Sequence, residues 1–303
     1  MLPKLEGFAA ALLGRLDHGV LATVASDLDA LSTTIQSRAD FSAVLTDTSI
    51  GHVARGQVVS DLLNGKISAD ALRLSVYAAS SVPAQEVPHA IDDLAHTART
   101  LLDSGEFHHP GLGLLAARRR VAGFADAYLD EIDTENFSEV EDDLFRWART
   151  VEANEALRQL LLDRDAPLEA RLGLTTQLLE GKVDPVSLAL AQFTIEGGRP
   201  RDVVGTLDYL VNYVAQSRDW RVARVHTARA LTSENQSELA SSLSALTGKS
   251  VELQIADDPS LLGGVLVEIG DLRLDATTRG RLGSLRDAVA ANRSLESALL
   301  RNN

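Results

Sequence analysis

The sequence contains no cysteine among its 303 residues. A chain without thiols forms no disulfides, has no thiol nucleophile and offers no thiolate to a metal. Aromatic residues make up only 4% of the chain, which argues against a surface that stacks on nucleic acid bases. Basic residues are also in the minority, with 29 Lys and Arg against 43 Asp and Glu and a formal net charge of −14. We therefore expect no nucleic acid partner, because such a partner usually requires a basic face.

Long apolar runs are missing as well. No stretch approaches the roughly 18 residues of a membrane-spanning helix, and the N-terminus from Met1 to Lys4 lacks the basic start and apolar centre of a signal peptide. The expectation is therefore a soluble cytoplasmic protein, and a peripheral role at a membrane would need a partner protein. With 45% hydrophobic and 24% charged residues, the composition is that of a folded chain, and the length suits two to three domains of roughly 100–150 residues.

A long internal repeat is the main feature of the sequence. When the chain is shifted by 116 positions, Gly7–Ala9 aligns with Gly123–Ala125 and Leu62–Ile67 aligns with Leu178–Val183. Solenoid repeats are only 20–50 residues long, so an offset of this size indicates two copies of a whole domain. Each copy carries apolar residues at helical spacing, interrupted by Gly and Pro, and is expected to form about six short helices.

The pattern changes after residue 219. Alternating residues predict strands at 222–227, 251–255, 264–269 and 272–275, the last two joined by a tight turn at Gly270-Asp271. Ser233 and Gln236 form a capping box that predicts the start of a helix running to Gly248. A final helix is expected from Thr277 or Thr278. This C-terminal segment therefore predicts a small α/β domain.

Together these patterns predict a mainly α fold with a small α/β domain. We expect two tandem six-helix bundles followed by a C-terminal α/β domain that contains a β-hairpin. The expected boundaries are 1–116 for the first helical copy, 117–217 for the second, 218–291 for the α/β domain and 292–303 for a polar tail.

Motifs that carry chemistry are absent or incomplete. There is no phosphate-binding loop and no Gly-x-Ser-x-Gly nucleophile elbow. Gly111–Gly113 is half of a dinucleotide fingerprint without a preceding strand and is interpreted as a connector. The adjacent pair His108-His109 cannot chelate a metal from one helical face and is interpreted as a solvated loop. We therefore expect no catalytic, cofactor-binding or metal-binding residue, and no cofactor.

Three other groups have ordinary structural explanations. Asp142-Asp143 and Asp257-Asp258 are interpreted as cap and turn residues. The basic run Arg118–Arg120 is interpreted as the solvated first turn of a helix rather than a nucleic acid patch. The pair Gly263-Gly264 could let a phosphate approach, but it lies between a turn and a strand and is interpreted as a structural turn or bulge.

The C-terminal segment resembles a known family. Its motif consists of Asp258, Pro259, Gly263, Gly264, Gly270, Asp271 and Asp275, with Arg281-Leu282 further on. It is similar to the signature of the delta subunits of rotary ATP synthases, whose mitochondrial counterpart is the oligomycin-sensitivity-conferring protein. The duplicated helical part resembles the long delta chains of actinobacteria, in the form without a fused membrane helix. Ala276 departs from the family, which often has Gly there.

The resemblance implies a peripheral-stalk subunit of a proton-translocating F-type ATP synthase, with no catalytic activity of its own. Its implied partners are the N-terminal helices of the α subunits and the b subunits of the stalk. Its implied location is the cytoplasmic face of the bacterial plasma membrane, held there through the complex. In this role it would resist rotor torque.

The family also implies a docking groove for the α helix between the first and fifth helices of the helical domain. In the second copy the residues expected there are Phe124, Ala127, Tyr128, Leu188, Ala191 and Gln192. The first copy would offer a second groove, with Phe8, Ala11 and Leu12 on its first helix, for another α N-terminus or for stalk helices. Each apolar residue among them is also compatible with a place in the domain core.

Two other functions remain open on the sequence. One is an all-α enzyme with a regulatory α/β tail, which lacks support from any polar cluster at helical spacing. The other is a stand-alone helical adaptor unrelated to energy conversion.

Overall fold

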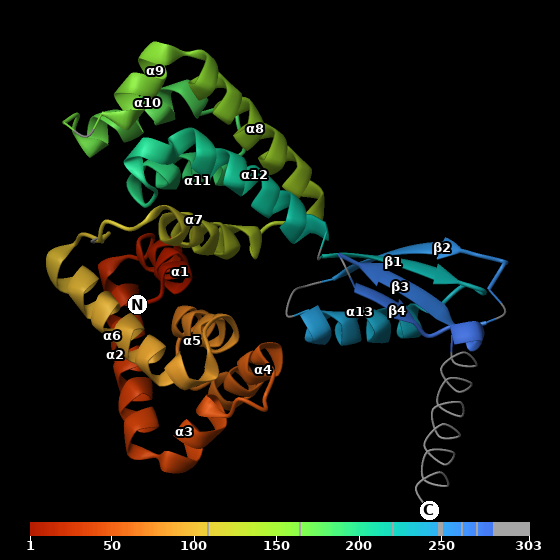
Figure 1. The fold of residues 1–303 in the computed structure, drawn as a ribbon. Helices are drawn as coiled ribbons and strands as arrows, with labels where there is room; N and C mark the ends of the chain where they lie inside the picture. Colours follow the sequence, from red (N-terminus) through yellow and green to blue (C-terminus); the bar gives the residue numbers. More distant parts are fainter. Residues whose placement is uncertain are drawn as a thin grey trace, which may run out of the picture. The chain divides into compact units, whose positions relative to one another are not determined.

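The computed structural model describes residues 1–107, 109–163, 165–219, 221–247, 251–261, 263–270 and 272–280. The chain divides into two compact units, the first from Met1 to Ala215 and the second from Gln216 onward (Figure 1). The first unit is helical, and the second contains a small sheet with a helix against it.

The first half of the helical unit consists of α1 (Pro3–Leu13), α2 (His18–Ser37), α3 (Ala39–Thr46), α4 (His52–Leu63), α5 (Ala69–Ser81), the 3-10 turn η1 (Ala84–Glu86) and α6 (Val87–Ser104). The second half consists of α7 (Leu114–Leu129), η2 (Thr134–Asn136), α8 (Phe137–Ala153), α9 (Glu155–Leu162), α10 (Leu168–Leu179), α11 (Pro185–Glu196), η3 (Pro200–Asp202) and α12 (Val203–Asp219). The elements α9, α10, α11, η3 and α12 each begin 116 positions after α3, α4, α5, η1 and α6.

Local contacts repeat with the same offset. Gly65 and Gly181 follow α4 and α10 with φ of 72° and 71°, a conformation that glycine adopts at little cost. One position further on, the Nζ of Lys66 donates to the carbonyl of Leu62, and the Nζ of Lys182 donates to that of Leu178. The sequence block that revealed the repeat is therefore the end of a helix and its cap.

Asp27 and Asp143 form another equivalent pair. The carboxylate of Asp27 accepts from the backbone N–H of Ser68, and that of Asp143 accepts from the N–H of Asp184. Both contacts tie the second long helix of a half to the start of its fifth helix. This corrects the interpretation of Asp143 as a cap or turn residue, because it lies inside α8 and is only 2% exposed.

One continuous apolar core runs through the helical unit and includes residues from both halves. Stacked rings join the first and fifth helices in each half. The ring centroids of Phe8 and Tyr77 are 3.7 Å apart, and those of Phe124 and Phe193 are 3.8 Å apart. The expected boundary between residues 116 and 117 falls inside α7, and the segment between α6 and α7 covers residues 105–113. The division of this unit into two six-helix bundles stays a prediction.

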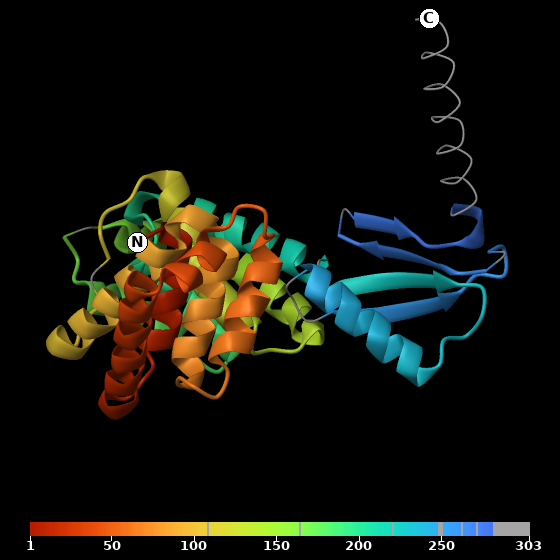
Figure 2. The same cartoon turned by 90° about the horizontal axis from the view of Figure 1, so that it is seen from below.

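The second unit contains β1 (Val222–Thr227), α13 (Ser233–Thr247), β2 (Glu252–Asp257), β3 (Val265–Ile269) and β4 (Leu272–Asp275). The sheet order is β2-β1-β3-β4, with β1 parallel to β2 and the other neighbours antiparallel. α13 covers one face (Figure 2) and buries Leu243 against alternate strand residues such as Val225 and Val267. The mainly helical fold with a small sheet is thus confirmed.

The start of α13 differs from the prediction by one residue. The hydroxyl of Thr232 accepts from the N–H of Asn235, and the side chain of Gln236 donates to the carbonyl of Leu231. Thr232 therefore caps the helix, and Ser233 is its first residue. The expected helix end at Gly248, the turn residue Asp271 and the final helix beyond residue 280 lie outside the described residues.

Candidate functional site

The two halves of the helical unit meet along a seam between α1 and α7. A Cβ atom on Gly7 would lie 1.7 Å from the carbonyl oxygen of Arg120, and one on Gly123 would lie 1.8 Å from that of Lys4. Both distances are far inside van der Waals contact, so only glycine allows the two backbones to approach this closely. Ala11 and Ala127 lie one turn further along the same faces and are 3% and 0% exposed.

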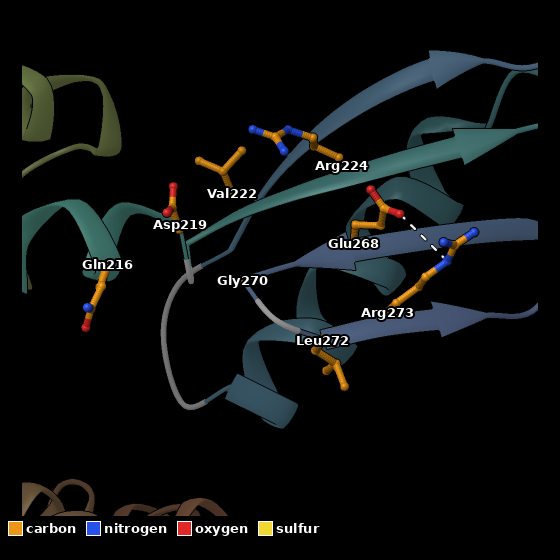
Figure 3. A pocket seen from close by; sticks show the side chains of 8 residues that line it. All are labelled: Gln216, Asp219, Val222, Arg224, Glu268, Gly270, Leu272 and Arg273. Atoms are coloured by element: carbon orange, nitrogen blue, oxygen red, sulfur yellow. Dashed lines mark ion pairs between the residues drawn. The ribbon is translucent and has the colours of Figure 1, made fainter.

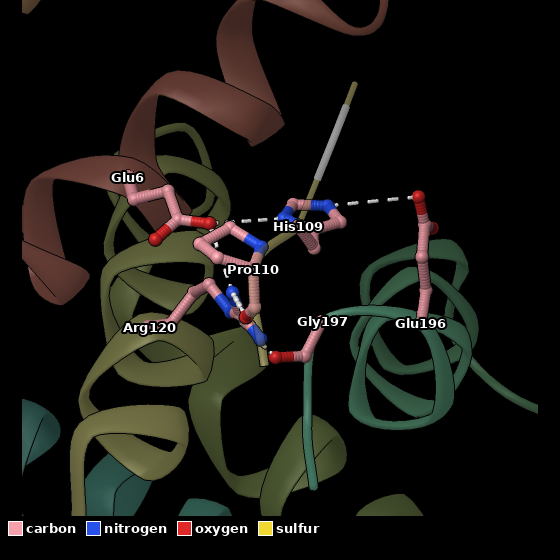
Figure 4. A network of polar contacts seen from close by, with 6 residues as sticks. All are labelled: Glu6, His109, Pro110, Arg120, Glu196 and Gly197. Atoms are coloured by element: carbon pink, nitrogen blue, oxygen red, sulfur yellow. Dashed lines mark hydrogen bonds and ion pairs between the residues drawn. The ribbon is translucent and has the colours of Figure 1, made fainter. Parts of the chain in front are cut away.

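A buried ionic cluster lies at one end of the seam (Figure 4). The guanidinium of Arg120 donates from Nη1 to Oε1 of Glu6 at 2.9 Å and from Nε to the carbonyl of Gly197 at 2.6 Å. It also donates to the carbonyl of Pro110. The Nδ1 atom of His109 lies 3.2 Å from the same Glu6 oxygen. One arginine thus ties α1, α7, the end of α11 and the connecting segment together.

The cluster corrects two interpretations from the sequence. Arg120 is 2% exposed and Arg118 forms an ion pair with Asp202, so only Arg119 of the basic run agrees with the expected solvated helix turn. The side chain of His109 is 8% exposed and faces the carboxylates of Glu6 and Glu196, so it is not in a solvated loop. His108 lies outside the described residues.

The charge state of Glu6 follows from these contacts. Burial by itself raises the pKa of a carboxyl group, but the hydrogen bond from His109 and the charge and hydrogen bond of Arg120 outweigh it, so the pKa of Glu6 is lowered. Beyond the C-terminal end of α7, the hydrogen bond from Arg15 lowers the pKa of Glu131 in the same direction. Both groups are therefore carboxylates at neutral pH.

These lowered pKa values predict a loss of stability in acid. A carboxyl group whose pKa is lower in the folded than in the unfolded state stabilises the fold above its ordinary value of 4.5, and this contribution is lost as the pH falls. We expect the free energy of unfolding, measured by urea titration at pH 7, 5, 4 and 3, to decrease below pH of about 4.5. Glu6→Gln and Glu131→Gln should each flatten this decrease. A variant with the wild-type pH profile would contradict the assignment.

A second polar cluster spans the two halves at Asp126. Its carboxylate accepts from the hydroxyls of Tyr77 and Tyr213 at 2.6 and 2.7 Å and pairs with the Nζ of Lys4 at 2.9 Å. Burial, together with the charge of Asp126, raises the pKa of both tyrosines well above the ordinary value, so both remain protonated donors. Neither polar cluster was predicted from the sequence.

The residues expected in the α-binding groove divide into two groups. Phe124, Ala127 and Ala191 are buried, at 9%, 0% and 1% exposure. Tyr128, Leu188 and Gln192 are half-buried, and the side-chain amide of Gln192 donates to the hydroxyl of Thr176. In the first half the corresponding residues Phe8, Ala11 and Leu12 are all buried. The docking role of these residues stays a prediction.

The residues of the C-terminal motif shape turns of the second unit. The carboxylate of Asp258 accepts from the N–H of Ser260, and that of Asp275 accepts from the N–H and hydroxyl of Thr277. Gly264 has φ of 83°, and a Cβ atom on it would lie 2.3 Å from the carbonyl of Ala276. Pro259 lies in the turn after β2, and Gly263 and Gly270 also have positive φ.

A polar recess of about 590 Å³ opens on the second unit (Figure 3). Arg224, Glu268 and Arg273 are cross-strand neighbours on β1, β3 and β4, and Glu268 pairs with Arg273 at 3.7 Å. Their side chains alternate with the buried residues that pack on α13, so they belong to the opposite, polar face. The other lining residues are Gln216, Asp219, Val222, Gly270 and Leu272.

Within the described part of the chain, no group of three His, Asp or Glu side chains has the arrangement of a metal site. No helix in that part combines the length and the apolar character that crossing a membrane requires.

Comparison with known proteins identifies the family. Residues 123–289, more than half of the chain, match the model of the ATP synthase delta (OSCP) subunit. The chain belongs to this family. It is 33% identical over 277 residues to the ATP synthase subunit delta of Salinispora arenicola, covering 90% of both chains. It is 32% identical over 286 residues to that of Nocardia farcinica, covering 94% of this chain and 95% of the relative.

A third relative, the ATP synthase subunit delta of a Parafrankia strain, is 34% identical over 266 residues, which cover 87% of this chain and 85% of the relative. Delta subunits are structural parts of the peripheral stalk of F-type ATP synthases and carry no catalytic site. The chain is therefore a non-catalytic stalk subunit that associates with other subunits of that complex. The enzyme and the stand-alone adaptor, which the sequence left open, are thereby set aside.

Proposed function

We propose that the chain acts as a stator that links the α/β catalytic hexamer to the b subunits and resists the torque of the rotor. The family match carries this proposal, because it extends from α7 through the sheet and so includes both kinds of structure. The N-terminal helices of the α subunits would bind the helical unit, and the end of the b stalk would bind the α/β unit. The complex would hold the chain at the cytoplasmic face of the bacterial plasma membrane.

The helical unit is proposed to consist of two tandem bundles, one from each copy of the repeat. The repeated helix starts and caps support this division. On the second bundle, Tyr128, Leu188 and Gln192 are the accessible members of the expected groove, and an amphipathic α helix would lie against them. Phe124, Ala127 and Ala191 are buried and would form the floor that supports this surface.

The polar face of the sheet is proposed to receive the b stalk. Arg224 is exposed at the centre of this face, beside the Glu268–Arg273 pair. Charged side chains in mixed order fit a partner helix that carries both acidic and basic residues. The hydrophobic face of the same sheet is already occupied by α13 and cannot serve this purpose.

Two variants of the full chain test the assignment of partners to units. We expect Leu188→Glu to weaken binding of a peptide with the α N-terminal sequence by about tenfold or more, because it places a charge in an apolar contact. We expect Arg224→Glu to weaken binding of a C-terminal b peptide in the same way. Each variant serves as the control for the other. Titration calorimetry would measure both affinities, and circular dichroism would confirm folding.

The proposal would be contradicted if each variant did not affect the binding of one peptide only. If Leu188→Glu weakened binding of the b peptide as much as binding of the α peptide, the two units would not bind different partners. The same would follow if Arg224→Glu weakened binding of the α peptide as much as binding of the b peptide. If neither folded variant changed either affinity, the proposed surfaces would be wrong although the family assignment would stand.

A further inference from the structure

The close backbone contacts of the two glycines across the seam between α1 and α7 are reciprocal. Lys4 and Arg120 occupy equivalent positions of the repeat, as do Gly7 and Gly123. Gly7 lies against the carbonyl of Arg120, and Gly123 lies against the carbonyl of Lys4. Exchange of the two halves therefore leaves these two glycine contacts unchanged. A surface that pairs with its own equivalent in this way has the geometry of an isologous twofold interface, such as forms between two copies of one protein.

The pseudo-twofold relation brings one pair of equivalent residues into direct contact. Arg15 follows the end of α1, and Glu131, its equivalent at an offset of 116, follows the end of α7. The Nη1 atom of Arg15 donates to Oε2 of Glu131 at 2.8 Å, and Nη2 donates to Oε1. At the point where a symmetric interface would place a residue against itself, this chain has opposite charges.

We propose that the seam is a self-pairing surface that Arg15 and Glu131 have made specific for unlike partners, so that the first repeat recognises the second and neither recognises its own kind. The partner that fits α1 is a helix with small residues at the positions of Gly123 and Ala127 and a carboxylate about two turns after the position of Gly123. The partner that fits α7 has the same small residues and a guanidinium. A second copy of the chain, approaching repeat to like repeat, would place Arg15 against Arg15 or Glu131 against Glu131.

The residues around this ion pair also differ between the two halves, and they strengthen the same difference in charge. Arg73 on α5 donates to Oε1 of Glu131 at 2.6 Å, whereas the equivalent of Arg73 in the second half is Ala189. The guanidinium carbon of Arg15 lies 5.6 Å from the ring centroid of Tyr128, whose equivalent in the first half is Leu12. The first half thus contributes two cations, and the second half contributes the carboxylate and the aromatic ring that receive them.

This selectivity acts through charge, while the close packing at the glycines supplies most of the attraction. The Arg15 and Glu131 side chains are 34% and 37% exposed, so solvent screens the pair and its net contribution is modest. Like charges at the same place would oppose pairing by a comparable amount. The arrangement therefore discriminates between partners of similar shape, which is what two repeats derived from one surface require.

Charge inversion in the full chain tests the proposal independently of the stalk function. We expect Arg15→Glu and Glu131→Arg each to lower the melting temperature by about 2–4 °C, the shift produced by roughly 1 kcal/mol in a unit of this size. The double variant Arg15→Glu/Glu131→Arg should have a higher melting temperature than either single variant. It again places opposite charges at the two positions, although in inverted order, so the native ion pair itself is absent. With Arg73→Ala added, the recovery should increase because Arg73 no longer repels the new arginine.

The control is the ion pair between Arg99 on α6 and Asp29 on α2, which lies within one half and whose side chains are 51% and 39% exposed. Inversion of either partner there should change the melting temperature by less than the single seam variants do. If the doubly inverted seam variant melted at or below the temperature expected from the sum of the two single shifts, with and without Arg73→Ala, the proposal would be overturned.

Discussion

Replacing Gly123 with alanine is expected to lower the free energy of unfolding of the helical unit by about 3 kcal/mol or more. The added methyl group would meet the backbone carbonyl of Lys4 at 1.8 Å, and no side-chain rotation can relieve a contact with backbone. α1 and α7 would have to separate, which would expose the buried alanines of the seam and disturb the clusters around Glu6 and Asp126. Urea unfolding followed by circular dichroism would measure the loss.

Gly173 provides the matched control. It lies inside α10, is exposed, and has no neighbour within 4 Å of an added Cβ atom. Alanine is a better helix former than glycine, so Gly173→Ala should raise the free energy of unfolding by about 0.5–1 kcal/mol. Equal effects of the two substitutions would show that helix propensity, rather than close approach of the two helices, determines the outcome at Gly123.

The features that were predictable from the sequence depend on local patterns. The strand at Val222–Thr227 alternates inward and outward residues, and the glycine caps at Gly65 and Gly181 end two helices of the same pattern. Repetition made these signals stronger, since the same block in both halves indicates the same local structure. The family assignment has the same basis, because the turns at Asp258 and Gly264 are recognised by residues close together in sequence.

The seam was not predictable in this way, because its partners are far apart in the chain. Gly7 and Gly123 have ordinary helical neighbours, and nothing local shows that each lies against the other helix. A small residue four positions later, Ala11 or Ala127, was the available signal, since glycine and alanine at this spacing allow helices to approach closely. Ala127, which the sequence predicts in a partner groove, is buried within the helical unit, and its docking role stays a prediction.

The burial of His109 and Arg120 was not predicted, because residue type alone indicated exposure to solvent. Both were expected in solvent because charged side chains are seldom buried without partners. Here the partners are carbonyls and a carboxylate brought together from α1, α11 and the connecting segment, and only the folded chain assembles them. The Nε and Nη1 atoms of Arg120 both have acceptors in this site, so its stability depends on each of these partners.

Replacing Arg120 with methionine is therefore expected to lower the free energy of unfolding by about 3–5 kcal/mol, as for other buried ion pairs that lose one partner. The substitution keeps much of the side-chain volume but leaves the Glu6 carboxylate buried with only His109 beside it. It also leaves the carbonyls of Gly197 and Pro110 without this donor. Urea unfolding at pH 7 would measure the loss.

Two further variants separate the causes. Arg119→Met changes the neighbouring exposed arginine and should alter the free energy of unfolding by less than about 0.5 kcal/mol. Glu6→Gln in combination with Arg120→Met removes the stranded charge and should recover part of the loss, because the buried carboxylate is its largest component. Equal losses for Arg119→Met and Arg120→Met would contradict a structural role for the cluster. A combined variant less stable than Arg120→Met alone would show that packing, rather than an unpaired charge, governs the stability of this junction between the two halves.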